Sequence, residues 1–299
     1  MMDVAIGNQR VVCSFCGTRV DPAAVESAVV PSNVRAFKHE RFHVWRCPVC
    51  RSLHCLEKVD LSVYYTNYPI TRTLSEPTRL TCDSLLQRLT KHGYRADSRL
   101  LDYGCGWGVF LAHLRESGYV NACGYDPYSG EAALRDRGCL EANAYDYVLV
   151  QDVLEHVEDG RALFAELNEY VRPGGCVLVG TPTADAISLR KYERHWTQLH
   201  VPYHLHIYTR AAVEAIGREA GWDVVDVFDR AYYDTPINGL NAWAINKYQS
   251  FTDGTLDALF DEVPREQLQR SIRFRTLARF GYWFKRNTGE IGILFRRPA

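Results

Sequence analysis

The stretch Leu100-Leu101-Asp102-Tyr103-Gly104-Cys105-Gly106-Trp107-Gly108 decides the fold of this chain. A short apolar run ends in Asp102, three glycines follow at alternate positions, and residues 109–117 then have a helical pattern. Glycines permit positive φ and close approach of the backbone to a ligand, while the free N–H groups of a helix start favour a negatively charged group. A nicotinamide-binding turn has the spacing G-x-G-x-x-G, whereas the third glycine here, Gly108, comes one residue early. The stretch therefore predicts a strand–turn–helix unit with a ligand site that does not suit a nicotinamide dinucleotide.

Strand-like and helix-like segments alternate outward from this turn. Strands separated by helices of this length predict an α/β fold, a Rossmann-like, doubly wound, mostly parallel sheet covered on both faces. We expect strands at 99–103, 120–125, 147–151, 176–180, 222–228 and 291–295, and helices at 109–117, 130–137, 161–171 and 210–220.

An acidic residue follows the second predicted strand. Asp126 lies about 20 residues beyond the turn, the distance at which a carboxylate can accept both ribose hydroxyls of a nucleotide. The structural alternative is that the glycines serve only a tight turn and that Asp126 caps the next helix. The combination of turn and acid favours a nucleoside-containing ligand, because the motif stands in a strand–turn–helix context.

Four motifs together resemble the class I S-adenosylmethionine (SAM)-dependent methyltransferases, especially the branch of the ubiquinone-pathway O-methyltransferases. The resemblance spans residues 98–230 in order. Its motifs are Asp102-x-Gly104-x-Gly106-x-Gly108, Gly124-Tyr125-Asp126-Pro127, the segment from Tyr145 to Val157, and Arg172-Pro173-Gly174-Gly175.

The resemblance implies which residues bind the cofactor. Asp102 and the glycine turn would hold the methionine end of SAM, Asp126 the ribose, and residues 151–153 the floor beside the amino-acid moiety. Glu155 and His156 are interpreted as helix-start and packing residues. The stretch 139–144 is too short for the usual third strand and its adenine-contacting acidic loop, so the adenine contact stays unassigned. The full predicted set is Asp102, Gly104, Cys105, Gly106, Gly108, Asp126, Pro127, Gln151, Asp152 and Val153.

Four of the ten cysteines form two C-x-x-C pairs, Cys13 with Cys16 and Cys47 with Cys50. This spacing is typical of a zinc ribbon, in which four thiolates hold one tetrahedral Zn²⁺. Because the protein fills all four positions, the metal would be structural rather than catalytic. The alternative is four independent buried thiols. Substitute ligands lie close by in the sequence: His39, His43, His54 and Cys55.

The composition predicts three parts along the chain. Residues 1–60 form a zinc-ribbon-like module, and 61–95 form a linker with a lead-in helix. Residues 96–299 form the methyltransferase domain with a helical insertion at about 238–286. In the linker, Tyr64, Tyr65 and Tyr68 are candidates to close over the cofactor or to pack at an interface. The insertion contains seven basic residues between 265 and 286, which suggest a solvated helix face or a site for a phosphate-bearing substrate.

Four of the ten histidines fall between positions 195 and 206, on a connection leaving the carboxyl ends of the strands. Methyl transfer to a hydroxyl benefits from a base whose pKa is near neutrality. His204 and then His200 are the predicted bases, because Pro202-Tyr203-His204-Leu205 resembles a Pro-x-His-Leu segment of related small-molecule methyltransferases. The alternative is that these rings bond the backbone in a packed loop. A metal site formed by these histidines is a further alternative, although no carboxylate at a convincing ligand spacing supports it.

Charge and hydropathy limit the partners. The 35 basic and 36 acidic residues leave a net charge of −1, which supplies no overall field for nucleic acid or an anionic membrane. No run approaches the roughly 20 apolar residues needed to cross a bilayer, and ten cysteines suit a reducing, cytoplasmic location.

The predicted function is methyl transfer from SAM to a hydroxyl of a small molecule, such as a sugar or specialised metabolite. A phosphate- or nucleotide-linked acceptor is one form of this hypothesis. The alternatives are an RNA methyltransferase that uses the ribbon for binding, and a non-enzymatic binding protein. A third is a sugar C-methyltransferase, because a zinc module ahead of this domain is similar to the bacterial deoxysugar C-methyltransferases. The acceptor atom and the oligomeric state are not predicted.

Overall fold

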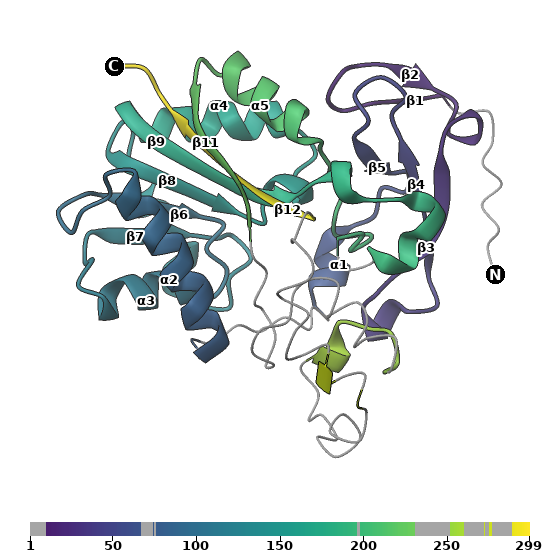
Figure 1. Cartoon of the computed structure of the whole chain (residues 1–299), viewed down its shortest axis with the longest axis horizontal. Helices are drawn as coiled ribbons and strands as arrows, with labels where there is room; N and C mark the ends of the chain where they lie inside the picture. Colours follow the sequence, from purple (N-terminus) through teal and green to yellow (C-terminus); the bar gives the residue numbers. More distant parts are fainter. Residues whose placement is uncertain are drawn as a thin grey trace.

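The computed structural model describes residues 10–66, 74, 76–195, 198–230, 252–259, 272, 275–276 and 289–299. Two sheets lie side by side, a six-stranded sheet on the left of Figure 1 and a four-stranded sheet on the right. A two-stranded ribbon, β1 (Val11–Val12) with β2 (Arg19–Val20), lies beside the smaller sheet.

The six-stranded sheet has the order β11-β12-β9-β8-β6-β7. Strands β7, β6, β8 and β9 are parallel, and β12 runs antiparallel between β9 and β11. The predicted Rossmann-like, mostly parallel sheet is confirmed. Its strands are β6 (Leu100–Tyr103), β7 (Ala122–Tyr125), β8 (Tyr145–Gln151), β9 (Val171–Pro182), β11 (Asp223–Asp229) and β12 (Glu290–Arg296).

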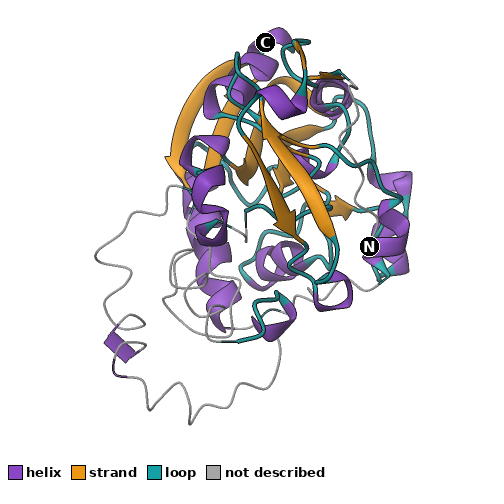
Figure 2. Cartoon of the chain, turned by 90° about the vertical axis from the view of Figure 1, so that its right-hand side faces the viewer, coloured by secondary structure: helices purple, strands orange, loops and turns teal. Residues whose placement is uncertain are grey.

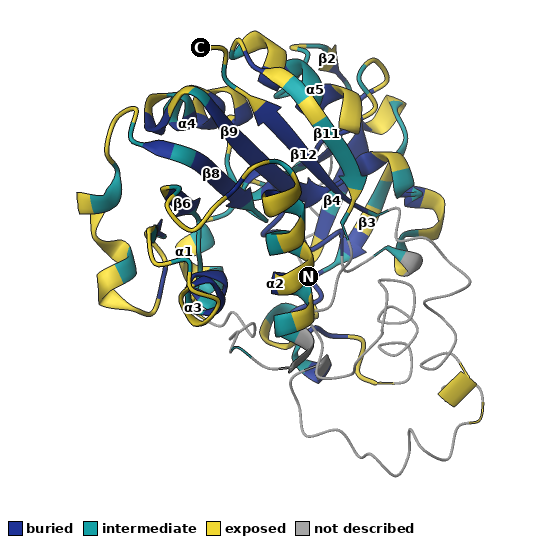
Figure 3. Ribbon diagram, turned by 60° about the vertical axis from the view of Figure 1, so that its left-hand side comes forward, coloured by how far each residue is buried: buried dark blue, intermediate teal, exposed yellow. Residues whose placement is uncertain are grey.

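Helices cover both faces of this sheet because its strands carry apolar side chains on each face. Tyr147 and Leu149 of β8 pack with α2 (Glu76–Lys91) and α3 (Val109–Glu116). Val148 and Val150 pack on the opposite face with α4 (Gly160–Tyr170) and α5 (Arg210–Glu219). Strands β8, β9 and β12 are accordingly buried along most of their length, while the outer sides of the helices are exposed (Figure 3).

The predicted helix at 130–137 is wrong. Two short 3-10 turns stand there, η3 (Ala132–Arg135) and η4 (Arg137–Cys139), and Asp136 closes the second by accepting a hydrogen bond from Gly138 N. The segment is mostly exposed, so it has no apolar stripe to hold a helix against the sheet. No strand follows between residues 126 and 144, all of which are described, so β7 is the edge of the sheet.

The four-stranded antiparallel sheet has the order β10-β5-β4-β3 and combines two distant parts of the chain. Its strands β3 (Ser27–Pro31), β4 (Arg41–Arg46) and β5 (Leu53–Cys55) come from the N-terminal segment, whereas β10 (His206–Ile207) follows β9 by more than twenty residues. Figure 2 shows the molecule with this side toward the viewer. The predicted domain boundary at residue 60 stays a prediction. The four-stranded sheet combines strands from both sides of that residue.

The core beneath this sheet is also shared. Val30, Phe42 and Leu53 pack with Leu199 and Ile207. The buried Arg46 guanidinium donates hydrogen bonds to the carbonyl oxygens of Ala184 and Ile187, at 3.3 and 2.6 Å. The N-terminal segment is thus held against the 184–207 connection by apolar packing and by hydrogen bonds.

The remaining elements connect these layers. The predicted lead-in helix is α2, and α1 (Leu61–Tyr65) precedes it, capped by Asp60, which accepts from Ser62 N. Most of the predicted helical insertion at 238–286 lies outside the described residues. No helix in the described part of the chain is long and apolar enough to cross a bilayer. The short 3-10 helices are η1 (Pro22–Ala24), η2 (Arg35–Phe37), η5 (Leu154–His156), η6 (Ala184–Ala186), η7 (Leu189–Arg194) and η8 (Asp257–Leu259).

Candidate active site

A cavity of about 930 Å³ lies beyond the carboxyl ends of β6, β7 and β8. The chain order reverses at β6, which pairs with β7 on one side and β8 on the other, and ligands of open α/β sheets bind at such a point. Nine of the ten predicted cofactor residues line the cavity, and Gly108 does not. The nine are Asp102, Gly104, Cys105, Gly106, Asp126, Pro127, Gln151, Asp152 and Val153.

The glycine turn has the backbone conformation expected of it. Gly104, Gly106 and Gly108 have φ values of +77°, +56° and +69°. A Cβ on Gly104 would lie 2.2 Å from Val153 Cγ2, so the turn also needs glycine for close packing against the residues after β8. Gly108 instead stands at the start of α3, where its left-handed conformation begins the helix.

Asp126 connects the turn to the end of β7. Its Oδ2 accepts from Gly106 N at 2.9 Å, and its Oδ1 accepts from Tyr128 N at 2.8 Å. Asp126 therefore has a structural role, because it accepts hydrogen bonds from the backbone of the glycine turn and of the turn that follows β7. Each carboxylate oxygen has a second lone pair, and the residue lines the cavity, so the same group can also accept ribose hydroxyls.

Asp102 is a buried carboxyl at the cavity wall. Burial, and next the charge of Asp126, raise the pKa of Asp102 to about 7. A buried carboxylate is stabilised by a cation placed beside it. The amino group of an amino-acid moiety would supply that cation.

The floor after β8 contains a strained residue held by an arginine. Asp152 has φ +55°, which is uncommon for a residue with a side chain. Arg230 binds its carboxylate with both terminal nitrogens, one of them at 2.9 Å, and also donates to Glu290 Oε2 at 2.6 Å. Although burial alone lowers the pKa of the Arg230 guanidinium, Asp152 and Glu290 hold it well above its ordinary value. Arg230 lines the cavity and was not predicted, because it is 78 residues from Asp152 and stands in no motif.

The two predicted bases lie behind the cavity rather than at its surface. His204 is buried, its Nδ1 donates to Gln198 O at 2.7 Å, and burial together with repulsion from His156 lowers its pKa to about 3. His200 is also buried, with its ring stacked on Tyr203 at 4.4 Å and its Nδ1 2.5 Å from Asn33 Oδ1. Neither histidine lines the cavity. His204 thus bonds the backbone, as in the packing alternative, whereas His200 faces an amide side chain. Residues 199 and 201 pack into the core shared with the N-terminal sheet.

Two other histidines line the cavity. His156 Nδ1 lies 3.0 Å from Tyr203 O and 3.1 Å from the Tyr65 hydroxyl, and burial lowers the pKa of His156 to about 4. His206 lies with Nε2 3.2 Å from Glu158 O and Nδ1 2.9 Å from His54 Nδ1. Burial, and next the neighbouring His54, lower its pKa to about 4. The sequence motif placed His156 among packing residues, although its position in the segment that follows β8 is a signal that it lies at the ligand edge.

Of the two linker tyrosines in the described part of the chain, Tyr65 lines the cavity. Tyr65 stacks on Tyr128 with ring centroids 5.2 Å apart and planes at 15°. Tyr64 packs on Phe37 instead and donates its hydroxyl proton to Glu40. Tyr68 lies outside the described residues.

The N-terminal segment forms the other end of the cavity. Residues 57–62 line it together with one residue of the four-stranded sheet and two of the β1–β2 ribbon and its connecting loop. The lining residues contributed by this segment are Val12, Ser14, Cys55, Glu57, Lys58, Val59, Asp60, Leu61 and Ser62. The cavity thus lies between the glycine turn and the N-terminal segment.

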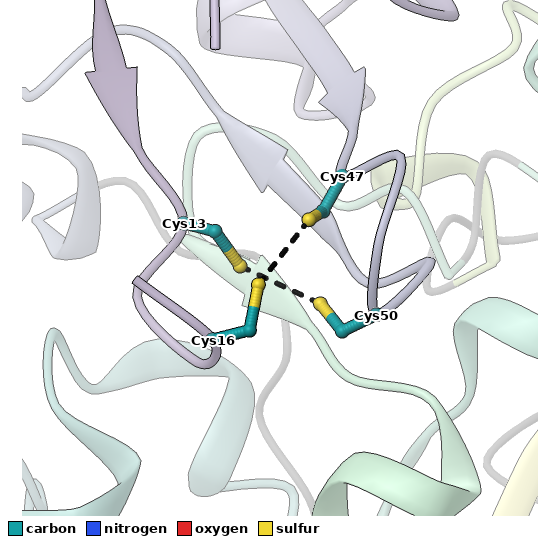
Figure 4. A group of neighbouring side chains, drawn as sticks. All are labelled: Cys13, Cys16, Cys47 and Cys50. Carbon is teal, nitrogen blue, oxygen red and sulfur yellow. Dashed lines mark hydrogen bonds between the residues drawn. The ribbon is translucent and has the colours of Figure 1, made fainter. Parts of the chain in front are cut away.

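The four paired cysteines converge on one point (Figure 4). Their sulfur atoms all lie within 4.8 Å of one another, with Cys13–Cys50 and Cys16–Cys47 distances of 3.5 Å. Left-handed residues close both knuckles, Gly17 at φ +71° and Arg51 at +65°. Of the substitute ligands, His54 contacts the cluster, with Nε2 3.2 Å from Cys13 Sγ. His43 pairs with Glu57 instead.

Comparison with known proteins gives a matching family model and several relatives. The model described as a methyltransferase domain matches residues 75–227. A ubiquinone biosynthesis O-methyltransferase of Rickettsia canadensis is 27% identical over 123 residues, which cover 35% of this chain and 51% of that protein. One of Cronobacter sakazakii is 29% identical over 109 residues, covering 30% and 44%. The chain therefore matches about half the length of these curated relatives.

Similar chains are also found among solved structures. The phosphoethanolamine N-methyltransferase 2 of Haemonchus contortus, in complex with S-adenosyl-L-methionine, has a TM-score of 0.46 and 17% identity over 73% of this chain and 53% of its own. The family model matches just over half of the 299 residues and includes the glycine turn, Asp126 and the segment after β8. This chain therefore belongs to the family of methyltransferase domains, which its residues 75–227 match.

Proposed function

We propose that the protein transfers a methyl group from SAM to a hydroxyl of a small-molecule acceptor held in the same cavity. The observation that carries the proposal is the two-ended lining, with the predicted cofactor residues at one end and Cys55 with residues 57–62 at the other. Pockets for small molecules occupy roughly 300–1,000 Å³. At about 930 Å³, this cavity is large enough for a cofactor and a small acceptor together.

The residues at the cofactor end would hold the amino-acid and ribose parts of SAM. Asp102 would face the amino group, Asp126 the ribose hydroxyls, and the backbone N–H groups of the turn the carboxylate. Methyl transfer is an in-line displacement: the acceptor oxygen bonds to the methyl carbon while the carbon–sulfur bond breaks and its electron pair goes to sulfur. Holding the two reactants in line supplies much of the rate.

The acceptor hydroxyl must lose its proton, and His156 is the lining residue proposed to assist it. Its Nδ1 faces a carbonyl oxygen, which can only accept, so Nδ1 carries the proton and Nε2 has the lone pair. A pKa of about 4 makes this imidazole a weak base at neutral pH, so it would need a further group to activate the hydroxyl.

We also propose that Cys13, Cys16, Cys47 and Cys50 hold one structural Zn²⁺. Sulfur atoms bound to one zinc ion at about 2.3 Å lie roughly 3.8 Å apart in a tetrahedron. The observed 3.5 Å pairs fit that geometry with small shifts. The ion would stabilise the β1–β2 ribbon against β4 and β5, and with them one wall of the cavity. Reduced cysteines of this kind are the basis for the proposed cytoplasmic location.

The basic residues of the N-terminal segment support a small-molecule acceptor over RNA. Arg46 is buried and pairs with Glu26, Arg51 pairs with the same carboxylate, and Arg35 pairs with Asp253. Cations already paired with carboxylates of the chain are less available to the phosphates of a nucleic acid. Whether the substrate carries its own phosphate rests on the basic residues near 265–286, most of which lie outside the described residues.

Calorimetric titration with SAM and with its demethylated product tests the cofactor proposal. Well-folded protein should bind both at one site. Incubation with methyl-labelled SAM and an extract of the source cells, followed by mass spectrometry and NMR of the labelled product, tests the acceptor. A label on carbon would support the C-methyltransferase alternative, and a label on RNA would contradict the small-molecule proposal.

A further inference from the structure

Two histidines connect the cysteine cluster to the cavity. His54 on β5 has its Nε2 3.2 Å from Cys13 Sγ and its Nδ1 2.9 Å from His206 Nδ1. His206 on β10 lines the cavity, and its Nε2 lies 3.2 Å from Glu158 O. The two rings meet because His54 and His206 stand directly opposite each other in the β5–β10 pair, where side chains share one face. An unbroken line of polar contacts therefore runs from a proposed zinc ligand to the cavity wall.

His54 is fixed by its surroundings and acts on a ligand rather than replacing one. The residue is 2% exposed, and its ring lies against Trp45 with centroids 4.6 Å apart. Among the described residues, the group of ligand atoms that converge at this site consists of the four sulfurs alone. A polar group that bonds a metal ligand from behind orients that ligand and affects the affinity for the metal.

The direction of the hydrogen bonds along this line depends on Cys13. A thiol can donate to His54 Nε2, whereas a thiolate held by a metal can only accept. A neutral imidazole has one N–H, so His54 that donates from Nε2 has a lone pair on Nδ1 and must accept there from His206. With a thiol at Cys13 the three bonds run the other way, and His206 Nε2–H donates to Glu158 O.

The proton on His206 therefore has two possible positions. Burial, and next the neighbouring His54, lower the pKa of His206 to about 4, so the ring is neutral at neutral pH and has a single N–H. When that proton is on Nδ1, Nε2 presents a lone pair at the cavity wall. When it is on Nε2, the same atom is a hydrogen-bond donor.

We propose that metal binding by the cysteine cluster sets the tautomer of His206 through His54, so that His206 Nε2 faces the cavity with a lone pair. As the metal binds, the Cys13 thiol proton passes to His54 Nε2, and the His54 Nδ1 proton passes to His206 Nδ1. The Nε2 proton of His206 leaves to water in the cavity, and the Cys13 sulfur bonds to the metal with the electron pair of its S–H bond. Both rings stay neutral, and nothing is oxidised or reduced.

The tautomer determines which ligand suits this end of the cavity. A lone pair 3.2 Å from the Glu158 carbonyl oxygen is favourable only when a donor bonds to it, so the metal-loaded protein favours a ligand with a hydroxyl there. Resting on the proposed methyl transfer, this hydroxyl belongs to the acceptor and is distinct from the one at His156. The acceptor class is a molecule with more than one hydroxyl, and His54 is the positioning residue that orients His206 toward it.

Nuclear magnetic resonance of zinc-loaded protein with ¹⁵N-labelled histidine tests the tautomer, because protonated and unprotonated ring nitrogens resonate far apart. His206→Phe identifies the resonances of His206. We expect His206 to be protonated on Nδ1 and unprotonated on Nε2, and His54 to show the opposite pattern. Protonation of His206 on Nε2, or on both nitrogens, would overturn the inference, as would a cluster that binds no metal.

Two changes at His54 form a matched pair. Glutamine offers an N–H to Cys13 and an oxygen to His206, whereas phenylalanine fills the space beside Trp45 and offers neither. His54→Phe should lose the lone pair at His206 Nε2 and weaken zinc binding about tenfold in a chelator competition, and His54→Gln should keep both. His92→Gln, which changes a histidine bonded to Asp226 outside the cavity, should behave as the wild type does. The same His206 tautomer in folded His54→Phe protein would contradict a role for His54.

The contact with the acceptor has its own readout. His206→Phe should lower the incorporation of label from methyl-labelled SAM into a cell extract by roughly threefold to tenfold, the effect of one hydrogen bond, and leave SAM affinity unchanged. Incorporation equal to that of the wild type would overturn the contact. Circular dichroism shows that each variant is folded, and the wild-type spectrum decides the tautomer if a variant is not. Protein that shows the expected tautomers and binds no SAM would contradict the proposed function alone.

Discussion

The two ends of the cavity are built in different ways. The cofactor end comes from three strand ends, at residues 102–106, 126–129 and 151–153, which lie side by side in one parallel sheet. The opposite end, which we propose holds the acceptor, comes from the N-terminal segment and from Leu205 and His206, which pairing between β5 and β10 brings together; its N-terminal lining residues are Val12, Ser14, Cys55 and residues 57–62. Local sequence motifs determine the first, whereas tertiary contacts between distant segments create the second.

Loss of a cysteine ligand should affect the N-terminal end of the cavity much more than the cofactor end. Cys16→Ser removes one of four proposed zinc ligands, and a small module depends on its metal for folding energy. We expect loss of the zinc atom and of methyl transfer, with a smaller loss of SAM affinity. Elemental analysis, an activity assay and a SAM titration measure the three quantities.

The matched control for that change is Cys176→Ser, which alters a buried cysteine on β9 that is remote from the cluster. It should keep about one zinc per chain, since four thiolates form one site. Equal zinc content in both variants would contradict the metal assignment.

Asp126→Ala tests the cofactor end directly. Removing a charged hydrogen-bond acceptor typically costs about 1.5–3 kcal/mol, which corresponds to a fall in SAM affinity of roughly tenfold to a hundredfold. Calorimetry gives the affinity, and a melting curve shows whether the fold persists. Asp136→Ala is the control, because this carboxylate closes the next turn and does not line the cavity. A similar loss in both variants would contradict a specific role for Asp126.

The pH dependence of SAM binding should report on Asp102. Its pKa is raised to about 7 by burial, so the free protein carries a neutral carboxyl below that pH and a cationic amino group would bind the ionised form. SAM affinity should therefore rise with pH through about 7, by up to about tenfold per pH unit below that value. Asp102→Asn should flatten the profile, and a wild-type profile as flat as the variant's would remove this role.

The same shift has a consequence for stability, with the opposite sign. Because the pKa of Asp102 is higher in the folded protein than the ordinary 3.8, the unfolded chain ionises first as pH rises. The contribution of this group to stability is therefore greatest below pH 4 and is lost between about pH 4 and 7. Denaturant unfolding at several pH values, compared with Asp102→Asn, isolates it.

Gly104→Ala should give the smallest of these effects, on stability. The new Cβ would lie 2.2 Å from Val153 Cγ2 on a backbone with φ +77°, so we expect a cost of about 1–3 kcal/mol. Gly118→Ala has a similar φ of +86° and no atom within 4 Å of its Cβ, so it should show the backbone strain alone. If the two variants were equally stable, the close approach of the turn to Val153 would be irrelevant.

The predicted and observed elements agree where periodicity and motif act within one segment. The strand predicted at 99–103 is observed at Leu100–Tyr103, and the helix predicted at 161–171 at Gly160–Tyr170. The helix predicted at 130–137 is wrong, because glycine and charged residues there leave no buried stripe.

The histidines show what a single sequence does not contain. Positions 200 and 204 have the appropriate residue type, but the burial that turns them away from the cavity arises from packing against Asn33 and the N-terminal sheet. The sequence shows no carboxylate close to His204, whereas in the folded chain Glu155 Oε1 lies 4.0 Å from its Nε2, although the two residues are 49 positions apart. Pairing of Arg230 with Asp152 is equally a product of tertiary structure.

The most direct test of the account is whether folded protein binds SAM at the glycine turn. Calorimetric titration of the wild type with SAM should show one site per chain, and Asp126→Ala should weaken it while its melting transition remains cooperative. A wild-type protein that is well folded yet binds neither SAM nor its demethylated product at high micromolar concentration would contradict the account.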